Sequence, residues 1–249
     1  MAHPDDEAIA CGALLQCIRH PMVVIATDGA PEDAYFWHEY GTRQRYAEIR
    51  EQESIAGLAA VGVSDSLFLR SRQLYAHEFA DQMLYDSLPR AFAEIVEAAR
   101  DFDPQAIFTL AYEGGHPDHD CCAFLATRLG RVLELPVFET PLYNRARGTL
   151  QYQQWPCRSE SDLEFDVEGT LLDRKRKMMA EYPSQAHVLA QFNPLVERIR
   201  PQADYDFTRR PHEGVLNYEA WGWKMTGEDL LSAFADFDAA FHTTRAPQR

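Results

Sequence analysis

Cysteine, positive charge and long hydrophobic runs are all scarce in this sequence, and each shortage excludes a class of protein. The five cysteines include no Cys-x-x-Cys pair, which argues against a disulfide framework and favours reduced thiols. The formal net charge of −15 argues against a nucleic-acid partner, because phosphate binding needs clustered Lys and Arg. No apolar run approaches the roughly 20 residues of a membrane span, and residues 1–6 do not resemble a signal peptide. We therefore expect a soluble, cytoplasmic protein.

Also missing is a Gly-x-Gly-x-x-Gly segment after any predicted strand, which argues against a nucleotide-binding oxidoreductase. What the chain does contain is 46% hydrophobic residues over 249 positions, enough for a sizeable core. We see no linker or repeat, and so predict a single domain over residues 1–249.

Short apolar runs alternate with segments of helical period. Strands are predicted at 22–26, 66–69, 106–110 and 136–142, and helices at 43–61, 79–100, 118–129, 171–181 and 227–241. Gly130 is predicted to close its helix, and the Pro- and Arg-rich residues 198–211 to be irregular. The alternation predicts an α/β fold with a mainly parallel, Rossmann-like sheet covered by helices.

Two acidic, histidine-containing pentapeptides stand out. They are His3-Pro4-Asp5-Asp6-Glu7 and His116-Pro117-Asp118-His119-Asp120, and each stands at the entrance to a predicted helix or turn. The second follows the predicted strand 106–110. Loops after parallel strands gather at the carboxyl edge of a sheet, so the two motifs can meet there.

The residue types in these motifs suit zinc. Catalytic zinc takes three protein ligands, commonly imidazole and carboxylate, and leaves one position for water. His3 and Asp6 are three residues apart and can aim at one point, and His119 supplies the third ligand. Asp5 is then free to act as general base. His116, as an imidazolium, can stabilise the oxyanion and protonate the leaving amine.

Simpler interpretations of these residues compete with a metal site. Acids at 5–7 could merely interact with a helix dipole, and His20-Pro21 shows that a His-Pro pair without acids means little. Two matching motifs nevertheless favour a metal site. Cys11, Cys121 and Cys122 are rival ligands, but their apolar neighbours favour buried hydrophobic side chains.

The motifs resemble those of a known family. Residues 2–7, followed by Cys11-Gly12 and paired with residues 116–119, are similar to the PIG-L/LmbE family of zinc-dependent N-deacetylases. Further similar segments lie at 49–53, 59–63, 103–108 and 177–185. The resemblance covers about residues 2–190 and leaves 191–249 as a variable C-terminal part.

The resemblance implies the same ligands and the same two catalytic residues, and it adds Arg50 as a substrate-binding residue. The alternative for Arg50 is a salt bridge with Glu53 or with a neighbouring helix. The implied reaction is hydrolysis of a small, sugar-like N-acetylated compound. Zinc-bound water, whose pKa is lowered towards about 7, attacks the acetyl carbonyl, and acetate and an amine are released.

Two departures from the family keep alternatives open. The family has a hydrophobic strand before the first motif, so we expect either a truncated start or another strand in its place. Leu69-Arg70-Ser71-Arg72 stands where sugar-processing relatives carry an Asp. A zinc hydrolase of a non-sugar amide or ester, or a metal-binding protein without turnover, are therefore the alternatives.

The sequence leaves the oligomeric state open, and a homo-oligomer is one possibility. Aromatic residues in the C-terminal part could wall a pocket, form a subunit contact or, for most of them, pack in the core. These residues are Tyr205, Phe207, Tyr218, Trp221 and Trp223.

Overall fold

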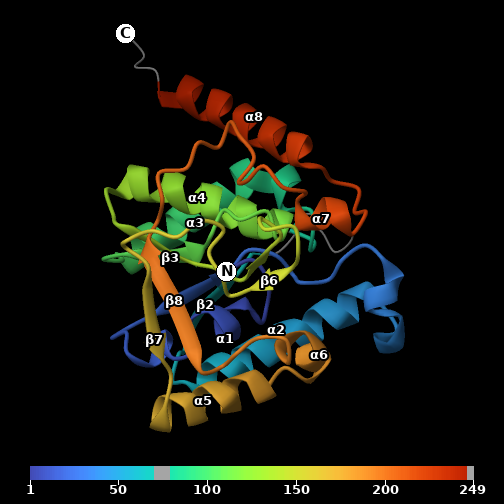
Figure 1. Ribbon diagram of the computed structural model, residues 1–249, viewed down its shortest axis with the longest axis vertical. Coiled ribbons are helices and arrows are strands. Elements are labelled where there is room, and N and C mark those ends of the chain that lie inside the picture. Colours follow the sequence, from blue (N-terminus) through green and yellow to red (C-terminus); the bar gives the residue numbers. More distant parts are fainter. Residues whose placement is uncertain (70–78, 246–249) are drawn as a thin grey trace.

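The computed structural model describes residues 1–69 and 79–245 (Figure 1). The α-helices are α1 (Asp6–Cys11), α2 (Arg43–Ala60), α3 (Leu88–Phe102), α4 (Pro117–Leu133), α5 (Gly169–Ala180), α6 (Ala186–Leu189), α7 (Asn217–Ala220) and α8 (Gly227–Arg245). The strands are β1 (Met22–Ile25), β2 (Asp65–Phe68), β3 (Ile107–Leu110), β4 (Val137–Thr140), β5 (Tyr143–Asn144), β6 (Gln151–Tyr152), β7 (Leu163–Asp166) and β8 (Val196–Pro201).

The strands form a mixed arrangement between helices. Strand β1 pairs with β2 in parallel, and a four-stranded sheet has the order β3-β4-β8-β7. In the larger sheet β3 and β4 are parallel, whereas β4–β8 and β7–β8 are antiparallel, as is the β5–β6 hairpin. Helices α3, α4 and α8 lie on one side of the strands, and α1, α2 and α5 on the other (Figure 1). The α/β class is thus as predicted, but a mainly parallel sheet is not confirmed.

Strand β8 is the main reason for that difference, because its residues fall partly within the segment predicted to be irregular. It lies between β4 and β7 and carries Arg200, whose Nε donates to Glu139 Oε1 at 2.6 Å. The guanidinium also lies 3.9 Å from the centre of the Trp155 ring. These contacts let an Arg-rich segment form an interior strand, because its buried charge has partners.

Three predicted helix boundaries differ from the structure by four residues or more: the start of α3, the end of α4 and the end of α8, which ends at Arg245 instead of residue 241. The helix expected from residue 79 begins only at Leu88, because Phe79 and Gln82 have φ values of 61° and 72°, which a helix cannot contain. Helix α4 continues through Gly130 and ends at Leu133. Gly130 serves close packing there instead, since a Cβ would lie 2.5 Å from Val137 Cγ2.

The start of the chain lies near the middle of the fold (Figure 1). The Met1 amino group donates to Val24 O at 2.8 Å, and Ala26 and Thr27 N–H groups donate to the carbonyls of Met1 and Ala2. Met1 and Ala2 are the part of the strand expected before His3 that the described chain contains. A cavity of about 970 Å³ lies between β1 and β3, lined by Met1 and by apolar side chains of both strands.

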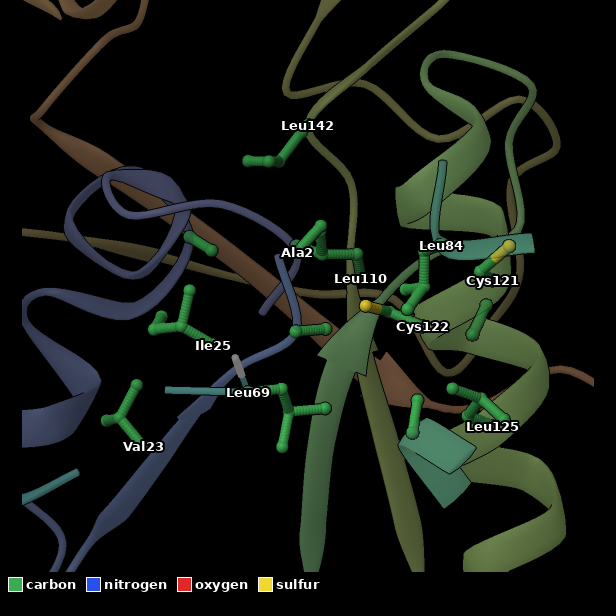
Figure 2. Packing of buried hydrophobic residues seen from close by; sticks show 14 of the residues in the cluster. Ala2, Val23, Ile25, Leu69, Leu84, Leu110, Cys121, Cys122, Leu125 and Leu142 are labelled. Atoms are coloured by element: carbon green, nitrogen blue, oxygen red, sulfur yellow. The ribbon is translucent and has the colours of Figure 1, made fainter. Parts of the chain in front are cut away.

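A hydrophobic cluster joins the helices to the strands. Figure 2 shows Cys122 of α4 directed toward Leu110, at the end of β3, with Leu125 further along the same helix. The second motif is thus held at the carboxyl end of β3 by the packing of α4. In the part of the chain that the structure describes, no helix is long and apolar enough to cross a membrane.

Candidate active site

The first motif connects the two N-terminal residues, which lie beside the end of strand β1, to helix α1. Asp5, the residue before the helix, has φ 144° and ψ −26°, a conformation that non-glycine residues rarely adopt. Its N–H donates to Glu7 Oε2 at 3.0 Å, and Glu7 also accepts hydroxyl hydrogen bonds from Ser54 and Tyr182. The fully buried Glu7 therefore fixes a strained turn that presents Asp5 and Asp6.

The second motif enters helix α4. His116 precedes Pro117 at the start of the helix, and its Nδ1 accepts the backbone N–H of Asp118 at 3.1 Å. Its Nε2 is thereby left to face the site. The next motif residues, Asp118 and His119, are almost completely buried, at 0% and 1% exposure. Acids that only cap a helix are usually exposed to solvent, whereas these side chains are buried.

The three predicted metal ligands lie close to one another, and two of them, His3 and His119, form a group with His116 that could hold a metal ion. His119 Nε2 lies 3.3 Å from His3 Nδ1 and 3.4 Å from Asp6 Oδ1, and His3 Nδ1 lies 3.5 Å from Asp6 Oδ2. Zinc–ligand bonds of about 2.0–2.1 Å in a tetrahedron put neighbouring ligand atoms about 3.3 Å apart. The two contacts of His119 Nε2 match that spacing, but His3 Nδ1 contacts Asp6 through Oδ2 and not through Oδ1. Among the described residues, the groups whose ligand atoms lie close enough together to hold a metal ion are His3, His116 and His119, and His3, Asp81, His116 and Asp118. Asp6 lies beside these groups and belongs to neither.

Hydrogen bonds determine which atoms of these ligands are available. Asp6 Oδ2 accepts the N–H groups of Ala2 at 3.0 Å and His3 at 2.8 Å, which leaves Oδ1 toward His119. His3 Nε2 lies 3.2 Å from Asp118 Oδ2. Such a carboxylate behind a histidine is the usual partner that orients a metal ligand.

The electrostatic surroundings also suit a cation. Burial lowers the pKa of His119 to about 4, which keeps its imidazole neutral and able to bind a metal. Burial alone would lower the pKa of His3, but the carboxylates of Asp81 and Asp6 hold it well above its usual range. The field that retains a proton on His3 is one that would equally favour a metal ion.

Asp5 and Arg50 form a buried pair beside the ligands. Arg50 Nη2 lies 3.1 Å from Asp5 Oδ1, and the guanidinium also donates to the carbonyls of Pro4 and Gly29. Burial raises the pKa of Asp5 to about 7, although Arg50 opposes this change. Glu53, the alternative partner of Arg50, instead accepts hydrogen bonds from Ser184.

Asp81 is a member of the site that the sequence analysis did not identify. Its Oδ1 lies 3.1 Å from His116 Nε2 and 3.3 Å from His3 Nε2, and its Oδ2 lies 3.8 Å from Arg50 Nη1. Burial alone would raise its pKa, but His3 and His116 hold it well below the usual range. Asp81 belongs to no motif and was assigned to a helix; its position in the chain after strand β2 was the available signal.

Two other predictions concern segments at the margin of the site. Of Leu69-Arg70-Ser71-Arg72, where relatives carry an Asp, only Leu69 lies within the described residues. The three rival cysteines are buried in the hydrophobic cluster, and burial raises the pKa of Cys122 to about 12. Among the described residues, the two groups that could hold a metal ion consist of histidines and aspartates and contain no cysteine.

Curated relatives of this chain come from Catenulispora acidiphila. The chain is 30% identical over 158 residues to 1D-myo-inositol 2-acetamido-2-deoxy-alpha-D-glucopyranoside deacetylase 1, covering 55% of this chain and 48% of the relative. Deacetylase 2 of the same organism is 32% identical over 139 residues, covering 47% of this chain and 45% of the relative. The chain spans about half the length of these curated relatives.

Solved structures share the fold at low sequence identity. The A40926 pseudoaglycone deacetylase Dbv21 has a TM-score of 0.62 at 19% identity, covering 82% of this chain and 95% of its own. The 4-carboxy-2-hydroxymuconate hydratase GalB from Pseudomonas putida has a TM-score of 0.51 at 16% identity, covering 82% and 94%. Because one is named a deacetylase and the other a hydratase, the fold alone does not specify the reaction.

The family, in contrast, is defined by the sequence that builds the site. The model of the GlcNAc-PI de-N-acetylase family, PIG-L, matches residues 1–129, more than half of the 249-residue chain. The matched segment contains both His-Pro motifs, Arg50 and Asp81. The chain therefore belongs to the PIG-L family.

Proposed function

We propose that this chain is a zinc-dependent hydrolase that removes an acetyl group from the amide nitrogen of a small amino-sugar substrate. The observation that carries the proposal is the buried group of His3, His116 and His119, whose ligand atoms lie close enough together to hold a metal ion, with Asp6 Oδ1 3.4 Å from His119 Nε2. The curated relatives are named for acetamido-glucopyranoside deacetylation, which supports the substrate class.

The roles of the remaining residues follow from their positions. When bound, zinc supplies a Lewis acid that polarises the acetyl carbonyl and makes water a better nucleophile. Asp5 takes the proton of the attacking water, and a pKa near 7 suits a base working at neutral pH. Asp5 then gives that proton to the amide nitrogen as the C–N bond breaks, so that acetate and a free amine leave. His116 Nδ1 accepts the Asp118 N–H, so its Nε2 carries the ring proton and would donate a hydrogen bond to the carbonyl oxygen as negative charge develops there.

Positioning residues support this division of labour. We infer that Arg50 acts through Asp5, because its guanidinium is 4% exposed and pairs with that carboxylate. Asp81 lies 3.1 Å from His116 Nε2 and so can orient the ring and hold its proton on Nε2. Both residues are thereby assigned to positioning within the site.

The test combines metal analysis with a substrate panel. Purified protein is assayed for zinc content, then stripped with a chelator and reloaded, and amine release is measured from N-acetylated sugars, N-acetylated alkylamines and acetyl esters. We expect amine release from the sugars that is lost with zinc and restored by it. Turnover of the other compounds alone would indicate a non-sugar zinc hydrolase, and stoichiometric zinc without any turnover would indicate a metal-binding protein.

A further inference from the structure

The C-terminal part of the chain places two tryptophans next to the catalytic histidines. The Trp223 ring centre lies 4.9 Å from that of His116 and 5.0 Å from that of Trp221. Trp221 in turn lies 6.1 Å from Tyr143, whose ring is 5.3 Å from His119. These rings form a continuous aromatic wall that leads from the two histidines to Trp221, which is 44% exposed.

Hydrogen bonds fix this wall to the second motif. Asn217, the first residue of α7, donates through its N–H to Gly114 O at 2.8 Å and through Nδ2 to Gly115 O at 3.1 Å. Its Oδ1 accepts from Arg145 Nε at 2.7 Å. Tyr218 O accepts the Trp223 N–H at 3.0 Å. The aromatic wall is therefore held in place before any ligand arrives, which lowers the entropic cost of binding.

The chemistry of the wall contrasts with that of the site behind it. The side chains around the predicted metal ligands are carboxylates, imidazoles and one guanidinium, and each of these residues is at most 8% exposed. The wall consists of indole and phenol rings, and such rings bind flat, uncharged rings through dispersion and contacts with the π system. Trp221 is two ring contacts away from His116, so it suits a group attached to the amino sugar and not the acetamide itself.

Resting on the proposed function, we propose that Trp221 and Trp223 form a subsite for a flat, uncharged ring linked to the acetylated amino sugar. The ring is either the C–H face of a second sugar or an aromatic aglycone. The other C-terminal aromatics have a different role, because Phe207 and Tyr218 are buried in the interior.

The experiment compares three glycosides of N-acetylglucosamine that carry a methyl group, a benzyl group or a second sugar. Trp221→Ala removes the exposed indole, Trp221→Phe keeps a ring, and Leu163→Ala removes an exposed apolar side chain of β7 as the matched control. An aromatic contact of about 0.5–1.5 kcal/mol corresponds to about 2- to 12-fold in affinity. We expect Trp221→Ala to raise KM for the benzyl glycoside or the disaccharide, relative to the methyl glycoside, by about that factor.

The three glycosides and the three variants distinguish the possible outcomes. A larger effect on the benzyl glycoside identifies an aromatic aglycone, and a larger effect on the disaccharide identifies a second sugar. Partial recovery in Trp221→Phe and no change in Leu163→Ala complete the expected result. Equal KM changes for all three glycosides would overturn the subsite.

A binding measurement keeps the subsite separate from the proposed function. If wild-type protein releases acetate from none of the glycosides, the deacetylase proposal fails, but tryptophan fluorescence still reports binding of the benzyl glycoside. If the subsite exists, the benzyl glycoside should quench the fluorescence of the wild type. Trp221→Ala should then weaken the affinity for this glycoside about 2- to 12-fold. Equal quenching in both proteins would refute it.

Discussion

Replacing Asp5 and Asp6 by asparagine, one at a time, separates the role of base from that of ligand. The two residues are adjacent, yet Asp5 Oδ1 faces Arg50 at 3.1 Å while Asp6 Oδ1 faces His119 at 3.4 Å. Asn keeps the shape of each side chain and removes its charge and proton-accepting oxygen. The two substitutions therefore test the directions in which these side chains point.

The two substitutions should change different quantities, kcat for Asp5→Asn and zinc affinity for Asp6→Asn. Asp5→Asn should keep zinc bound and lower kcat by about 10²–10⁴, which corresponds to about 3–5 kcal/mol of transition-state stabilisation. Changing a residue that only orients a metal ligand costs about 10–100-fold in affinity. Asp6→Asn changes a ligand itself and should weaken zinc binding by at least about 100-fold, with activity partly restored by excess metal.

The assay measures zinc content, zinc affinity by chelator competition, and amine release at matched metal loading. Thermal unfolding of each variant serves as the control, because Asp5→Asn removes the carboxylate that pairs most closely with the buried Arg50 and leaves those of Asp81 and Asp6. If Asp5→Asn lost zinc and Asp6→Asn kept it, the two roles would be reversed. If both variants kept zinc and full activity, the active site would lie elsewhere.

Three further substitutions test the surrounding residues. His119→Ala should cut zinc content sharply while far-UV circular dichroism stays near that of the wild type; stoichiometric zinc in the variant would remove His119 from the ligands. Asp118→Asn should weaken zinc binding about 10–100-fold in chelator competition, because Asp118 orients His3 through Nε2; unchanged affinity would make its role purely structural. Arg50→Ala should lower kcat more than it raises KM, because Arg50 pairs with Asp5. A rise in KM alone would instead assign Arg50 to substrate binding.

Local features of the site were predictable because short-range geometry fixes them. A His-Pro pair followed by acids at a helix entrance constrains where His3, Asp6 and His119 can point, whatever the rest of the fold does. Asp81 was not predictable in this way. It is a single acid outside any motif, and the loop that carries it reaches the site through Asp118, which accepts the N–H of Gln82 at 2.7 Å.

The errors in the fold have the same origin. Strand β8 has an Arg-rich sequence that local propensity assigns to a loop, but Glu139 and Trp155 provide partners for Arg200 only once the sheet has formed. Gly130 looks like a helix end in the sequence, yet it lies within α4 because Val137 packs against it. Tertiary contacts overrode local preference in both cases.

The charges of the site argue for a metal more strongly than the fold does. The buried carboxylates of Asp5, Asp6, Asp81 and Asp118 lie close to the histidines of the two motifs. Arg50 is the permanent cation paired with the first, and the remaining positive charge in this cluster depends on protonation of histidine. Burying carboxylates without compensating charge is unfavourable, and a pKa of about 7 for Asp5 is one local consequence of that burial. A divalent ion between Asp6 and His119 would supply positive charge where the guanidinium of Arg50 is not placed. The fold is shared with a protein named as a hydratase, so it is this charge arrangement that favours metal-assisted hydrolysis.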